Sequence, residues 1–135
     1  MSAPGYEEVE HTADLALRVW GNDFLSLLDH SAKGMYLLLG ITSNESFPVD
    51  WTLRIENGSK ECVLVDFLSE LLYLSEEKSI FLDQFHFSGS CEFLEIKASG
   101  YRLDRIDRSI KAVTFHNLEL RETDFGLETT ITFDI

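Results

Sequence analysis

The residues best suited to chemistry lie near the two ends of the chain. The segment 11–14, His-Thr-Ala-Asp, directly precedes an alternating segment, and Asp134 stands one position before Ile135. The Asp134 side chain therefore lies beside the α-carboxylate of Ile135, and if Asp14 lies near them, three carboxylates converge. Hard oxygen ligands suit Ca²⁺, Mg²⁺ or Mn²⁺. One interpretation is a divalent-cation site; the other is that these acids are merely solvated, as most are in a chain with 24 of them.

Other signatures of catalysis are absent from the sequence. It contains no GxxxxGK[ST] phosphate loop, no HExxH zinc motif and no GxSxG nucleophile elbow. The four histidines, His11, His30, His86 and His116, lack metal-ligand spacing. We interpret His30, in an expected helix, and His86, in an expected strand, as structural residues, with a ligand role as the alternative. Without a nucleophile or a phosphate loop, the protein is expected to have no enzymatic activity of its own.

The charge balance limits the classes of partner. Eleven Lys and Arg against 24 Asp and Glu give a formal net charge of −13. Such a surface repels the phosphates of nucleic acids and the anionic face of a membrane, so no stable binding to either is expected. It favours a cationic partner or divalent metal ions.

Targeting and disulfide signals are also missing. No Lys or Arg precedes Arg18, as a signal peptide would require, and the longest apolar run, 35–39, is too short for a membrane span. We interpret Cys62 and Cys91, neither in a CxxC motif, as small buried hydrophobic residues in a reducing compartment. These features predict a cytoplasmic protein.

The chain is expected to form one domain over residues 1–135. The periodicity of its apolar side chains predicts the helices and strands that hold the candidate site residues. Alternation predicts strands at 6–10, 14–20, 51–56, 80–87, 91–98, 111–120 and 127–133, and helical spacing predicts helices at 24–39 and around 64–72. Asn22 is the expected N-cap of the first helix, and Gly40 its C-terminal glycine. Ser88-Gly89 is the expected hairpin turn, and segments 41–50 and 101–108 are expected to be irregular. Two helices can cover one face of a mostly antiparallel sheet, so the predicted class is α+β.

Four blocks of sequence, in order, resemble the archease family. They are 6–17 (YEEVEHTADLAL), 64–74 (LVDFLSELLYL), 111–120 (KAVTFHNLEL) and 133–135 (FDI). Phe67, Ser69 and Asn117 depart from the residues common in the family, Trp, Asn and Gly. Asn tolerates the left-handed backbone that Gly would adopt. The resemblance implies a strand–helix–strand–strand module with a second such module inserted into it.

The resemblance also implies a function. Archeases are protein cofactors of the GTP-dependent RNA ligase of tRNA splicing and RNA repair; they promote guanylylation of the ligase and its multiple turnover. The matching positions are Asp14, Lys111, Asp134 and Ile135. The two aspartates, helped by the backbone or terminal carboxylate of Ile135, would bind a divalent cation such as calcium. Lys111 would engage the ligase or its nucleotide, or else is an ordinary surface lysine that opens a strand.

Two other functions stay open at this stage. A small metal-dependent enzyme would use Asp14, Asp134 and His11, and would need a pocket with a perturbed acid or base. A chaperone-like binding module would need a contiguous exposed apolar patch.

Overall fold

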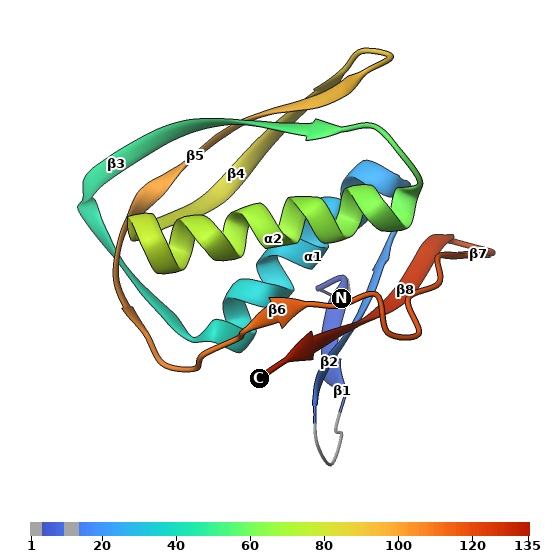
Figure 1. The fold of residues 1–135 in the computed structure, drawn as a ribbon, viewed down its shortest axis with the longest axis horizontal. Coiled ribbons are helices and arrows are strands. Elements are labelled where there is room, and N and C mark those ends of the chain that lie inside the picture. Colours follow the sequence, from blue (N-terminus) through green and yellow to red (C-terminus); the bar gives the residue numbers. More distant parts are fainter. Residues whose placement is uncertain (1–3, 10–13) are drawn as a thin grey trace.

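The computed structural model describes residues 4–9 and 14–135 and consists of two helices and eight strands within that part of the chain (Figure 1). In chain order the elements are β1 (Tyr6–Val9), β2 (Leu15–Gly21), α1 (Phe24–Leu39), β3 (Ile41–Glu56), α2 (Lys60–Lys78), β4 (Ile80–Gly89), β5 (Phe93–Ile106), β6 (Ala112–Val113), β7 (Arg121–Thr123) and β8 (Gly126–Asp134).

The strands form two antiparallel sheets. The first has the order β1-β2-β8-β6, with β7 also paired to β8, and the second has the order β3-β5-β4. The second sheet and α2 come from one continuous segment, 41–106, which is a strand–helix–strand–strand module. It is inserted between α1 and β6 of a similar module that contains β2, α1, β6 and β8. This arrangement confirms the predicted α+β class and adds that the strands divide between two sheets.

Each helix packs mainly on the sheet of its own module, and the helices contact each other. α1 lies against β1, β2 and β8, and α2 lies against β3 and β4. The core formed between these layers contains fully buried Phe67 and Phe133. Phe67, on α2, meets Phe85 and Phe87 of β4 edge to face, with ring centroids 5.4 and 5.9 Å apart. Edge-to-face pairs of this kind are favoured by the aromatic quadrupole.

The ends of α1 follow local capping rules. Its N-cap is Asp23, one residue after the expected Asn22: Asp23 Oδ1 accepts a hydrogen bond from the Ser26 amide at 2.8 Å. That hydrogen bond lowers the pKa of the Asp23 carboxyl, because it favours the charged form. Gly40 ends the helix with a φ of 63°, which confirms the predicted left-handed glycine.

Two segments expected to be irregular are strands. β3 begins at Ile41 and β5 continues to Ile106, and these two residues are paired. The polar segment 41–50 lacks the alternation of a strand because bulges between Thr42 and Ser43 and between Asn44 and Pro48 shift its register. Segment 41–50 is a strand because it pairs with β5, although its own sequence does not predict one.

The segment 111–120 was expected to be one strand, but only Ala112–Val113 pairs with β8. Beyond it the chain turns: the Leu118 amide donates to the Phe115 carbonyl at 3.0 Å. Asn117 has a φ of 53°, so it adopts the left-handed conformation expected for the position where the family commonly has Gly. The turn ends the pairing after two residues.

The hairpin turn and the cysteines also differ from expectation. Ser88 and Gly89 pair with β5, and the turn lies one to three residues later, where the Ser90 amide donates to the Phe93 carbonyl at 2.9 Å. Cys91 lies in this turn and Cys62 in the first turn of α2, and both are free and exposed. The prediction of buried thiols was therefore wrong: Cys91 lies in the exposed turn between β4 and β5, and Cys62 lies in the exposed first turn of α2.

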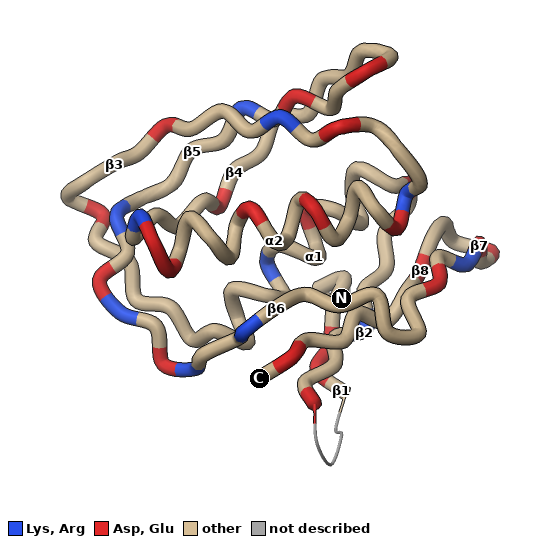
Figure 2. Tube along the Cα trace, in the orientation of Figure 1, with Lys and Arg blue, Asp and Glu red and all other residues tan. Residues whose placement is uncertain are grey.

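Acidic side chains are spread over both modules. Figure 2 shows Asp and Glu along α2, on β1 and around β7, with fewer Lys and Arg between them. In the described residues, neither helix is long and apolar enough to cross a membrane.

Candidate functional site

The end of β8 is where the predicted site residues meet. β8 lies between β2 and β6 in the first sheet. On one side, the last residue pair between β2 and β8 is Leu15 with Phe133. Asp14 directly precedes Leu15 and Asp134 directly follows Phe133, so both aspartates lie at the same end of this strand pair. The two aspartates, 120 positions apart in sequence, thus lie at one end of the first sheet.

Lys111 borders the same end from the other side. Its amide donates to the Asp134 carbonyl at 2.7 Å, and the next residue, Ala112, pairs with Asp134. Thr114 continues the attachment, since its Oγ1 donates to the Thr132 carbonyl at 2.9 Å. The backbone of β8 therefore holds Lys111 beside Asp134. We call Asp14, Lys111, Asp134 and Ile135 the tip.

The tip combines an accessible outer layer with a rigid base. Asp134, Lys111 and Ile135 are exposed, and Asp14 is half-buried. One residue further in, Phe133 is fully buried, and Ile110, which precedes Lys111, is also fully buried. Buried neighbours on both strands fix the backbone, while the charged side chains remain open to solvent or to a partner.

The donor set at the tip fits a hard divalent cation. Two carboxylates at one end of the sheet and the main-chain oxygen of Ile135 are oxygen ligands, the type that Ca²⁺, Mg²⁺ and Mn²⁺ prefer. Within residues 4–9 and 14–135, no three His, Cys, Asp or Glu side chains gather as a metal-binding group.

The histidines of the described chain differ in burial. His30 is half-buried in α1, as expected for a residue of this helix, and its Nδ1 lies 2.6 Å from the Trp20 carbonyl oxygen. His86 and His116 are exposed. The expected contribution of His11 falls outside the described residues, as does the rest of the polar cluster before Asp14.

The chain is similar to proteins of one family along its whole length. A model of the archease protein family (MTH1598/TM1083) matches residues 6–135. Protein archease of Methanosarcina acetivorans is 31% identical over 96% of this chain and 95% of that protein. Protein archease of Methanosarcina barkeri is 30% identical, with 100% of both chains covered.

Solved structures share the fold. The solution structure of protein 1598 of Methanobacterium thermoautotrophicum covers 98% of this chain and 100% of its own, with a TM-score of 0.72 and 19% identity. The crystal structure of an archease, described as a possible chaperone, from Thermotoga maritima covers 96% of both chains, with a TM-score of 0.69 and 22% identity.

Proposed function

The chain belongs to the archease family, and from this membership we propose that it is a non-catalytic protein cofactor of a GTP-dependent RNA ligase. That ligase joins an RNA end with a 3′-phosphate or cyclic phosphate to a 5′-hydroxyl. The cofactor promotes guanylylation of the ligase and multiple turnover in tRNA splicing and RNA repair, in the cytoplasm.

The observation that carries the proposal is the convergence of Asp14, Lys111 and Asp134 on one exposed end of the first sheet. Asp14 and Asp134 would hold a divalent cation between neighbouring strand ends. When bound, the cation would supply stabilisation of negative charge on a transferring nucleotidyl group. Lys111 would place a positive charge next to the same group or pair with an acid of the ligase.

The charge of the whole chain supports the same partner. A ligase that binds RNA ends and GTP needs a basic cleft, and a chain with a net charge of −13 is attracted to it.

The test is ligase turnover with and without this protein under multiple-turnover conditions. We expect wild-type protein to raise turnover, and Asp14→Ala or Asp134→Ala to return it to the basal rate. Each variant should change the free energy of unfolding by about 0.5 kcal/mol or less, because neither side chain is buried. Lys111→Ala should weaken activation while Lys111→Arg retains part of it.

The matched control is Glu122→Ala. Glu122 is an exposed acid on β7, which pairs with the opposite end of β8 from Asp134. This variant removes one negative charge from the same sheet and should activate like wild type. Full activation by Asp134→Ala, or ligation or nucleotide hydrolysis by the purified protein alone, contradicts the proposal.

A further inference from the structure

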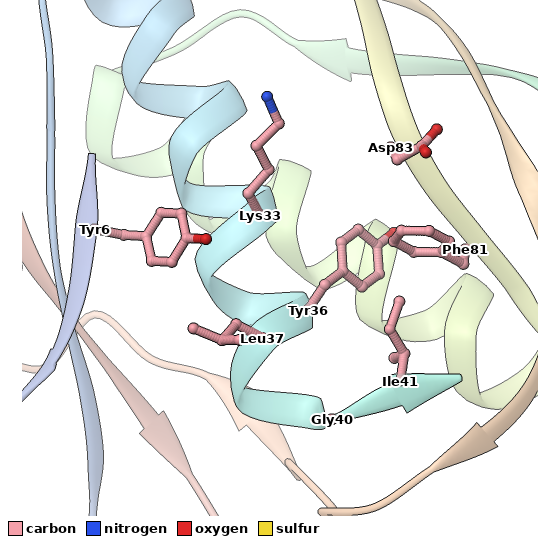
Figure 3. Close-up of a pocket in the computed structure, with 8 residues that line it drawn as sticks. All are labelled: Tyr6, Lys33, Tyr36, Leu37, Gly40, Ile41, Phe81 and Asp83. Carbon is pink, nitrogen blue, oxygen red and sulfur yellow. The ribbon is translucent and has the colours of Figure 1, made fainter. Parts of the chain in front are cut away.

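A groove separate from the tip crosses α1 between the edges of the two sheets (Figure 3). It encloses about 330 Å³. Tyr6 of β1 lies on one side, and Phe81 and Asp83 of β4 lie on the other. The surface of α1 forms the floor between them, with Leu37 pointing toward Tyr6 and Tyr36 toward Phe81 (Figure 3). β1 and β4 are edge strands of their sheets, so the groove lies between two sheet edges, with α1 between them.

The floor of the groove is aromatic and rigid. Tyr36 is buried, and its hydroxyl accepts a hydrogen bond from the Leu82 amide at 3.3 Å. The Phe81 ring meets the Tyr36 ring edge to face, with centroids 4.8 Å apart. Beside them Leu37 is 64% exposed, more than Leu25, the other exposed leucine of α1.

The charges around the groove are not balanced. Lys33 is held by Asp29, one helical turn earlier, with Nζ and Oδ2 2.8 Å apart. Across α1, the half-buried Asp83 has no Lys or Arg nitrogen within 4.0 Å in the part of the chain that the structure describes. Burial raises the pKa of Tyr36, and the negative charge of Asp83 acts in the same direction, so the carboxylate lies close enough to influence the floor. The groove thus offers a negative charge without a direct ion-pair partner among the described residues, together with the half-buried rings of Tyr6 and Phe81.

We propose that this groove binds an arginine side chain of the partner ligase, an inference that rests on the function proposed above. A guanidinium group is planar and weakly hydrated, so it packs on aromatic faces while it donates hydrogen bonds to a carboxylate. Arg is also enriched among the residues that contribute most to binding at protein interfaces. An apolar side chain would fill the floor but would leave Asp83 partly desolvated without a partner.

The groove lies on the side of the molecule that leads to the tip. α1 ends beside the segment that precedes Lys111: the amides of Asp107 and Arg108 both donate to the Leu39 carbonyl, each at 3.0 Å. Arg108 also reaches β1, with Nη1 3.9 Å from Glu8 Oε2. A protein bound at the tip can therefore extend along this side and reach the groove.

The test measures ligase turnover against the concentration of this protein. In Asp83→Asn, the concentration needed for half-maximal activation should rise about tenfold, the loss expected for one hydrogen bond between charged groups. The maximal turnover should stay at the wild-type level, because the tip is unchanged. Asp134→Ala should show the opposite pattern, a lower maximum. The control Asp66→Asn, at an exposed acid of α2, should match wild type in both values.

A second measurement does not depend on the ligase. N-acetyl-arginine methylamide is titrated into the isotope-labelled protein, and the amide resonances of Leu37, Ile41 and Asp83 are followed by NMR. The arginine probe should shift these resonances in wild type and not in Asp83→Asn, whereas the neutral isostere N-acetyl-citrulline methylamide should leave them in place.

The two measurements separate the two proposals. If wild-type protein does not activate the ligase, the proposed function fails, and the titration alone decides whether the groove recognises arginine. Unchanged half-maximal activation in Asp83→Asn, with normal activation by wild type, overturns the inference. Equal shifts with the arginine and citrulline probes, or no shifts with either, also overturn it.

Discussion

Tyr36 is one buried residue on which the second sheet depends. Its hydroxyl accepts the hydrogen bond of the Leu82 amide at the edge of β4. Removal of the hydroxyl leaves that buried amide without a partner, which costs about 1–3 kcal/mol. Tyr36→Phe should therefore lower the free energy of unfolding by about this amount at neutral pH, measured by urea denaturation.

The buried hydroxyl of Tyr36 should also make the stability of the protein depend on pH in the alkaline range. Burial raises the pKa of Tyr36 above its ordinary value of 10.0, so the unfolded chain loses this proton before the folded protein does. The protonated Tyr36 hydroxyl therefore contributes its full share of the unfolding free energy below about pH 10, and this contribution declines as the pH rises above that value. Between about pH 8 and pH 11, wild type should lose more unfolding free energy than Tyr36→Phe. Tyr73→Phe, at a half-exposed tyrosine of α2, is the control and should lose as much as wild type.

At the scale of the elements, β4 and β5 approach unusually closely at Gly100. The register shifts between Leu82 and Gln84, and this bulge carries Asp83 at the groove. A Cβ atom on Gly100 would overlap the Phe81 carbonyl and lie 2.8 Å from Leu82 Cα. Because these are backbone atoms, they cannot move aside without a shift of β4.

Gly100→Ala should therefore destabilise the protein by about 1–3 kcal/mol, the usual cost of overpacking. Gly89→Ala, in the same strand pair, is the matched control, because its Cβ would meet no atom within 4 Å. Urea denaturation of both variants tests the difference. Equal stability of the two would mean that β4 can move away from Gly100 at little cost.

At the scale of the whole molecule, the net charge of −13 governs association more than folding. Attraction between an acidic chain and a basic cleft is screened within about 10 Å at 0.1 M salt. The concentration of this protein that gives half-maximal ligase activation should thus rise severalfold between about 50 and 300 mM NaCl. The basal turnover of the ligase at each salt concentration is the reference. An unchanged value across this range would contradict electrostatic attraction as the source of the encounter.

The local features of the fold could be predicted from the order of the residues. Leu28, Ala32, Met35 and Leu39 recur at helical spacing, and Gly40 ends their helix in the predicted conformation. The alternation of apolar and polar residues predicted β2 and β8. The resemblance to the archease family pointed to Asp14, Lys111 and Asp134 as site residues. These signals succeed because periodicity and capping depend on residues within one or two turns of each other.

Features that depend on residues far apart in the sequence became visible in the folded structure. The polar segment 41–50 is a strand because β5 pairs with it. β6 ends at Val113, although the alternation of residues 111–120 predicts a longer strand. The tip required β8 to lie between β2 and β6, and the groove required two sheet edges to meet over α1. Asp83 carried no signal in the sequence, because its importance comes from Tyr36 and Tyr6, which lie 47 and 77 positions away. Contacts of this range arise from packing, which no local pattern of residues encodes.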